Sequence, residues 1–176
     1  MRVIVNLVIL LMLIGLMAGA VYLYQLDREQ VRAIETTRTE LRRLQQQVKL
    51  QATLGTVELS DRGYPVTIDP AWFEHDRPVN VLLGSAHPWV EIAHEDQSHL
   101  KHPIDPVAHD RKQAQFWYNP SSGQVRARVP ARPSDQTTLD LYNLINNSHL
   151  TSLFDMTRET PPVMEPVPSR GRSRRR

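Results

Sequence analysis

The chain has 176 residues, of which 13 are prolines and 7 are glycines, and it contains no cysteine. This length suits one folded domain with a modest core, and the lack of cysteine excludes disulfides, thiolate metal ligands and cysteine nucleophiles. The formal net charge is only +2, so the composition does not indicate nucleic acid as a partner.

The first predicted element is a membrane-spanning helix over residues 1–26. Residues 3–26 carry no charged side chain and are rich in Leu, Ile, Val and Met. At about 1.5 Å per residue this helix would be roughly 36 Å long, enough to cross a hydrocarbon core of about 30 Å. A cleaved signal peptide is the alternative, because Ala18-Gly19-Ala20 has the small-x-small form that signal peptidase accepts. We expect a retained helix, because the apolar run continues beyond Ala20 as far as Tyr24.

The predicted location is therefore the cell membrane, with a single span and with the C-terminal domain outside the cytoplasm. The side of the membrane on which the C-terminal domain lies stays open. Several arginines follow the apolar run, and an excess of Lys and Arg is typical of the cytoplasmic side. A leader of one basic residue is instead typical of exported signal anchors. Gly15 and Gly19 form a G-x-x-x-G pair, which lets two membrane helices approach closely, and we predict that both take part in assembly.

The second predicted element is an amphipathic helix over residues 27–54, a stretch without proline or glycine. Its apolar residues follow a thin heptad pattern that predicts four further assembly residues: Ile34, Leu41, Leu44 and Val48. Two interpretations are open. The stripe either forms a short coiled coil between two chains or packs on the domain that follows it. Gly55 is expected to end the helix.

A small α+β domain is predicted over residues 55–159, built on an antiparallel sheet. Short extended segments alternate with turn residues, and we expect strands in the ranges 56–69, 79–83, 89–93, 114–118 and 124–129. The last two form the clearest hairpin, with residues 119–123 as its loop. Alternation in its second strand predicts that Val125, Ala127 and Val129 face the core and that Arg126 and Arg128 face solvent. The aromatic residues Trp72, Phe73, Trp89, Trp117 and Tyr118 are expected in the core.

A second helix is predicted after Pro133. Leu139, Tyr142 and Ile145 share one face, and Ser134 or Asp135 can cap the helix start. Residues 160–176 are rich in proline and then in arginine, a composition that predicts disorder.

The histidine-rich segment 94–110 raises the question of a metal site. The candidate ligands are His94, His99, His102 and His109, since imidazole suits zinc and other divalent ions. Their spacing matches no common metal site, and a solvated polar loop is the other interpretation. No G-x-S-x-G surrounds a serine, and no other catalytic pattern is present. We therefore predict no metal, no cofactor, no catalytic residue and no enzymatic activity.

The order of these elements resembles the type IV pilins and the pseudopilins of type II secretion. The resemblance rests on residues 3–26 and 27–54, followed by "GYPVTIDPAWF" and "FWYNPSSGQVRARVP". The chain lacks the leader glycine and the Phe-Thr-Leu-x-Glu motif at which pilin precursors are cleaved. The resemblance implies a long helix packed on a small sheet, in a structural subunit that assembles through its helix in a secretion or surface-filament system.

The partners implied are copies of the same chain, other membrane-anchored subunits and the membrane itself. The alternative function is a bitopic membrane scaffold that dimerises through a short coiled coil and presents a partner-binding domain. The two functions differ in assembly order, since the first requires many chains and the second requires two.

Overall fold

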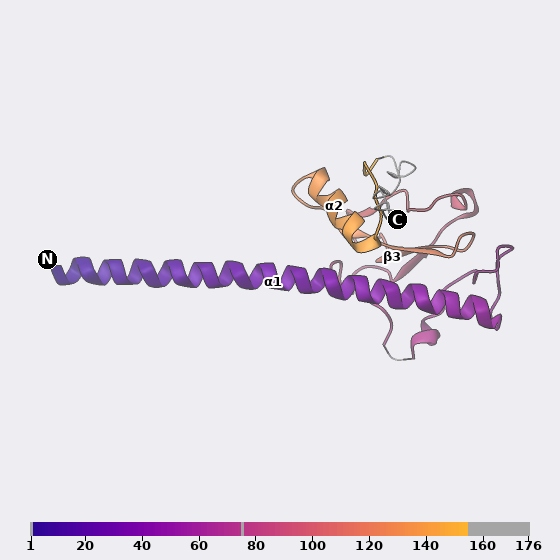
Figure 1. The fold of residues 1–176 in the computed structure, drawn as a ribbon, viewed down its shortest axis with the longest axis horizontal. Coiled ribbons are helices and arrows are strands. Elements are labelled where there is room, and N and C mark those ends of the chain that lie inside the picture. The colour runs from indigo at the N-terminus through magenta and orange to yellow at the C-terminus, as the bar shows by residue number, and fades with distance from the viewer. Residues whose placement is uncertain (1, 75, 155–176) are drawn as a thin grey trace, which may run out of the picture.

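The structure, a computed structural model, describes residues 2–74 and 76–154, without the side chains of residues 2–5 and 7–11. The predicted disorder of residues 160–176 lies outside the described residues. One long helix, α1 (Arg2–Leu54), extends from a small domain that holds all the other elements (Figure 1). In chain order these are η1 (Pro70–Phe73), β1 (Val90–Ile92), η2 (Glu95–Gln97), β2 (Val107–Ala108), β3 (Phe116–Asn119), β4 (Gln124–Ala127), β5 (Val129–Pro130) and α2 (Asp135–Asn146).

Helix α1 covers both helical segments that the sequence predicts, without a break between them. It ends at the expected glycine. Gly55 adopts a φ of +63° and donates its N–H to the carbonyl oxygen of Gln51, a left-handed termination that favours glycine. The helix length follows from the absence of proline and glycine between residues 27 and 54.

The prediction of a membrane-spanning helix is wrong, and the predicted location in the cell membrane as a single-pass protein is wrong with it. Across the described residues, no helix has an apolar stretch of the length that a membrane crossing requires. Beyond Leu26 the helix continues with the charged residues Asp27, Arg28 and Glu29.

The strands form two small sheets rather than the antiparallel sheet expected. In the first sheet β3 is central, antiparallel to β4 and parallel to β1. In the second, β2 and β5 pair in parallel. Strand β1 joins β3 in parallel because the chain between them, residues 93–115, crosses over the sheet instead of turning back at its end. The fold is therefore α+β with mixed pairing.

Two of the predicted strands are not strands. Residues 56–69 contribute only the isolated bridge between Leu59 and Pro65. The range 79–83 is a turn, because the carbonyl oxygen of Asn80 accepts hydrogen bonds from the backbone N–H groups of Leu83 and Gly84. The Asn80 side chain is fully buried and donates to the backbone carbonyls of Gln115 and Arg128. A buried amide that satisfies its own hydrogen bonds in this way stabilises the turn over an extended strand.

The core of the domain forms around the C-terminal half of α1. Strand β4 and helix α2 pack on one side of the helix, and the segment that carries η1 passes along the other side (Figure 1). Polar contacts reinforce this packing: Gln45 donates to the carbonyl of Val125, and Arg43 pairs with Asp76 at 2.7 Å. Of the aromatic residues expected in the core, Phe73, Trp117 and Tyr118 are buried, whereas Trp72 and Trp89 are partly buried and pack against it.

The predicted hairpin is confirmed, since β3 and β4 pair with Asn119 opposite Gln124. The inward face of its second strand is also confirmed, because Val125, Ala127 and Val129 are completely buried. The solvent-facing position predicted for Arg128 is wrong: this residue is 3% exposed. The second face of the sheet is covered by residues 94–106, so every residue of β3 is buried.

Helix α2 begins and packs as the sequence predicts. Ser134 is its N-cap, and the Ser134 hydroxyl accepts a hydrogen bond from the backbone N–H of Thr137. Leu139, Tyr142 and Ile145 are buried on one face. The helix ends at Asn147, which adopts a left-handed conformation with a φ of +49°.

The buried Tyr118 hydroxyl predicts a loss of stability at high pH. Burial, with a smaller contribution from Tyr64, raises the pKa of Tyr118 well above its ordinary value of 10.0. The unfolded chain then releases this proton near pH 10 while the folded chain keeps it, so the free energy of unfolding falls as the pH rises above about 10. The expected slope is about 1.4 kcal/mol per pH unit, measured by urea unfolding between about pH 9 and 11.5. Tyr118→Phe should reduce this slope and Tyr22→Phe, on an exposed ring, should not; equal slopes in both variants would contradict the assignment.

Candidate assembly surface

The N-terminal half of α1 forms an arm that projects from the domain (Figure 1). We call residues 12–32 the arm, because every side chain in this range is exposed. Its large apolar side chains have between 45% and 71% of their surface exposed: Met12, Leu13, Ile14, Leu16, Met17, Val21, Tyr22, Leu23, Tyr24, Leu26 and Val31. Soluble monomers rarely expose a contiguous apolar surface of this kind, so the arm is the candidate functional surface.

The apolar residues surround the arm on every side. Successive residues of an α-helix are rotated by about 100°, so Met12, Met17 and Tyr22 lie about 140° apart and divide the circumference into three. Gly15 and Gly19 leave gaps in this surface, since no atom beyond the adjacent helix backbone lies within 4 Å of the place that a Cβ atom would occupy. At the base of the arm the apolar run gives way to charged residues, and the Arg28 guanidinium lies 4.4 Å from the centre of the Tyr24 ring.

The four other predicted assembly residues lie within the domain. Leu41, Leu44 and Val48 are at most 2% exposed, and Ile34 is partly buried against the same core. Of the two interpretations of the heptad pattern, the structure therefore shows the packing of this stripe on the chain's own domain. Their side chains face β4 and α2 rather than the surface.

The histidine candidates for a metal site lie apart. His94, His99 and His109 are exposed, whereas His102 is buried, and its Nδ1 atom lies 3.0 Å from the hydroxyl oxygen of Tyr142. Within residues 2–74 and 76–154, no three histidine or acidic side chains come close enough together to hold a metal ion.

The histidine-rich segment instead covers the second face of the first sheet, and polar side chains of the hairpin hold its backbone. The Asn119 amide nitrogen lies within 3.2 Å of the carbonyl oxygens of Gln97, Ser98 and Leu100. Further along, the Nε atom of Arg126 donates to the carbonyl of Lys101. The alternation of apolar residues does not reveal these anchors; the only sequence signal is the polar type of the residues on the outer face.

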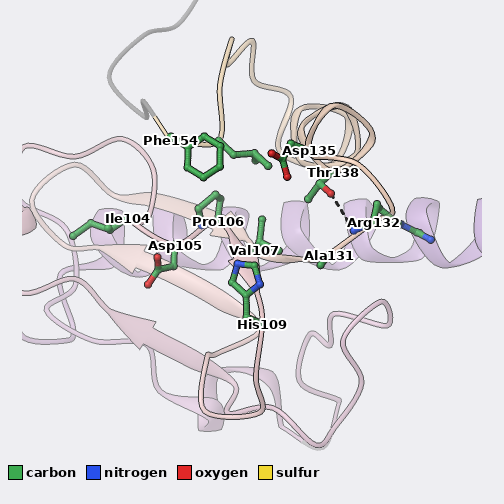
Figure 2. Close-up of a pocket in the computed structure, with 11 residues that line it drawn as sticks. Ile104, Asp105, Pro106, Val107, His109, Ala131, Arg132, Asp135, Thr138 and Phe154 are labelled. Atoms are coloured by element: carbon green, nitrogen blue, oxygen red, sulfur yellow. Dashed lines mark hydrogen bonds between the residues drawn. The ribbon is translucent and has the colours of Figure 1, made fainter.

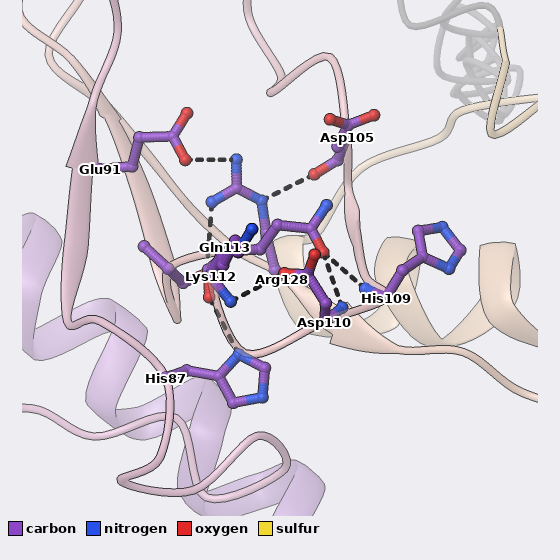
Figure 3. Close-up of polar contacts among 9 residues, drawn as sticks. His87, Glu91, Asp105, His109, Asp110, Lys112, Gln113 and Arg128 are labelled. Carbon is purple, nitrogen blue, oxygen red and sulfur yellow. Dashed lines mark hydrogen bonds and ion pairs between the residues drawn. The ribbon is translucent and has the colours of Figure 1, made fainter.

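Arg128 completes this set of anchors (Figure 3). Its Nη2 atom pairs with Glu91 of β1 at 2.9 Å, and its Nε and Nη1 atoms donate to the carbonyls of Asp105 and Ala114. One buried guanidinium thus joins β1, the segment 94–106 that covers the sheet, and the backbone at Ala114, just before β3. Arginine suits this position because its planar fork presents several donors in fixed directions.

A groove lies between α2 and the second sheet (Figure 2). We call it the α2 groove; its volume is about 260 Å³, and it is lined by Ile104, Asp105, Pro106, Val107, His109, Ala131, Arg132, Asp135, Thr138, Leu153 and Phe154. Val107 and Thr138 are buried in its wall, whereas Ile104 is 61% and Phe154 is 85% exposed at its opening. The sequence gives no motif for this groove, because its lining comes from three separate segments of the chain.

Comparisons with protein-family models, with curated proteins and with solved structures find no match to this chain.

Proposed function

We propose that this chain is a structural subunit of a multi-copy assembly that forms by packing of the arms of several copies. The observation that carries the proposal is the arm itself, whose exposed apolar side chains lie on all sides of the helix. Burying one large apolar side chain contributes about 1.5–3 kcal/mol, so association of arms would be strongly favourable.

The distribution of these residues favours many neighbours over one. A two-chain coiled coil buries one narrow seam of each helix, which would leave Met17 or Tyr22 exposed if Met12 were covered. The heptad stripe offers no second seam, because Leu41, Leu44 and Val48 are buried in the domain. Contact with neighbours on several sides is a property of arrays that continue by head-to-tail contacts.

The arms of other copies are suitable partners for this arm. Each copy exposes the same apolar surface. None of residues 12–26 is charged, so this part of two arms can pack together without burying an unpaired charge. Gly15 and Gly19 permit a close approach between helices at one point. An apolar helix that continues into a small domain is also the plan that this chain shares with pilins and pseudopilins, which supports a structural role.

The test is chemical cross-linking through introduced cysteines. Because the chain has no native cysteine, only the introduced thiols react. Met17→Cys and Leu26→Cys together place two thiols about 180° apart on the arm, at positions 71% and 45% exposed. Treatment with a flexible bis-maleimide should give a ladder of dimers, trimers and larger species on a denaturing gel. Each subunit in such a ladder has at least two neighbours.

The matched control carries Asp61→Cys and Arg111→Cys, two exposed domain positions, and should give mainly monomer. A product that stops at the dimer would overturn the multi-copy proposal in favour of a two-chain scaffold. A monomer from the arm variant at micromolar concentration would remove the arm as an assembly surface altogether.

A further inference from the structure

We propose that the α2 groove is the docking site for the proline-rich segment of the same chain, residues 160–168. The groove does not depend on the arm, since its lining comes from residues 104–109, 131–138 and 153–154. The proposal therefore stands apart from the assembly role proposed above.

The position at which the described chain ends is the first argument. Leu153 and Phe154, the last two described residues, themselves form part of the groove wall (Figure 2). Only the six residues 155–160 separate Phe154 from Pro161. They span at most about 25 Å when extended, enough for the next residues to turn back into the groove. A tether this short gives an effective concentration in the millimolar range, so modest contacts suffice for docking.

The chemistry of the groove is the second argument. The segment Thr160-Pro161-Pro162-Val163 continues through Met164 and Glu165 to two further prolines, Pro166 and Pro168. Such sequences favour the polyproline II conformation, which docks in apolar grooves that carry an aromatic side chain. Phe154 supplies the aromatic ring, with Pro106 and Ile104 as its apolar neighbours in the lining (Figure 2).

The polar residues of the groove complement the rest of the segment. A polyproline II helix makes no internal hydrogen bonds, so its carbonyl oxygens need donors, and the His109 ring in the lining carries an N–H in either neutral tautomer. Asp105 and Asp135 are exposed carboxylates of the lining, and the segment continues into five arginines, at positions 170, 172, 174, 175 and 176. The docked segment would then bury the side chains of Ile104 and Phe154, which are 61% and 85% exposed.

Disulfide trapping in the full chain tests the proposal. The groove pair combines Ala131→Cys, an exposed position in the lining, with Val163→Cys in the segment. The control pair combines the same Val163→Cys with Asp140→Cys, which is exposed on α2 and is not part of the groove lining. Each chain is equilibrated with reduced and oxidised glutathione, so that the two thiols are oxidised to a disulfide as oxidised glutathione is reduced. The fraction of disulfide gives the effective molarity of each pair.

The expected effective molarity is about tenfold higher for the groove pair than for the control pair, and independent of protein concentration. Adding Ile104→Ser and Phe154→Ser to the groove pair should lower it to the value of the control pair. Equal values for the two pairs would overturn the proposal. A disulfide that forms only between two molecules, and more readily at higher concentration, would assign the groove to the segment of another copy and overturn the docking within one chain.

Discussion

Replacing Arg128 by methionine is expected to lower the free energy of unfolding by about 2–4 kcal/mol. Methionine fills a similar volume but leaves the carbonyls of Asp105 and Ala114 without this donor. It also removes the partner of Glu91, whose side chain is 40% exposed. Because that carboxylate still reaches water, the cost stays below that of a fully buried orphan charge. Urea unfolding followed by circular dichroism measures the change.

Two further variants isolate the cause of this loss. Arg62→Met removes an exposed arginine and should change the stability by less than about 0.5 kcal/mol. Arg128→Lys keeps the charge but loses the planar fork, so its stability should lie between those of the wild type and Arg128→Met. If Arg128→Met were no less stable than Arg62→Met, the guanidinium would not be what holds the covering segment on the sheet.

Replacing Gly123 by alanine is also expected to destabilise the fold by about 2–4 kcal/mol. Gly123 closes the β3–β4 loop with a φ of +66°, a conformation that costs about 1 kcal/mol for a residue with a Cβ atom. The new Cβ atom would overlap ring atoms of Tyr64, including Cγ of that ring. Forcing the ring aside adds about 1–3 kcal/mol. Thermal and urea unfolding both report the loss.

Gly63 is the matched control, because its φ of +81° is also left-handed but the space around its Cβ position is open. Gly63→Ala should therefore cost only about 1 kcal/mol. The double variant Tyr64→Ala with Gly123→Ala removes the ring and should show a favourable coupling of about 1 kcal/mol or more in a double-mutant cycle. Equal losses for Gly63→Ala and Gly123→Ala would mean that the Tyr64 ring moves away without cost.

Regular patterns in the sequence predicted the elements that local chemistry specifies. Helix α1 ends at Gly55 because this glycine follows a long stretch without helix breakers. Helix α2 begins at Ser134 because its hydroxyl can cap the first turn. The hairpin follows from a run of aromatic residues and an alternating strand on the two sides of a loop that ends in Gly123. In each case residues close in the sequence decide the outcome.

Several of the wrong predictions concern features that depend on contacts between residues far apart in the sequence. Residues 79–83 resemble a strand, but the buried Asn80 side chain bonds to Gln115 and Arg128 and stabilises a turn. The position of Arg128 in the alternating pattern predicts a solvent-facing side chain, but residues 94–106 cover that face of the sheet. The predicted membrane span over residues 1–26 is also wrong, because no helix in the described part of the chain has an apolar stretch long enough to cross a membrane.

The sequence by itself determined that an apolar helix continues into an amphipathic one and leads to a small α+β domain. Periodicity and capping depend on residues close in the sequence, so they can be identified without knowledge of the fold. Only the tertiary structure decided which apolar residues of α1 are available to partners. Ile34, Leu41, Leu44 and Val48 pack into the chain's own domain, while the side chains of the arm stay exposed. A helix shows the same apolar pattern whether its own domain or another chain covers it. Only the position of the domain along the helix distinguishes the residues packed in the core from those exposed on the arm.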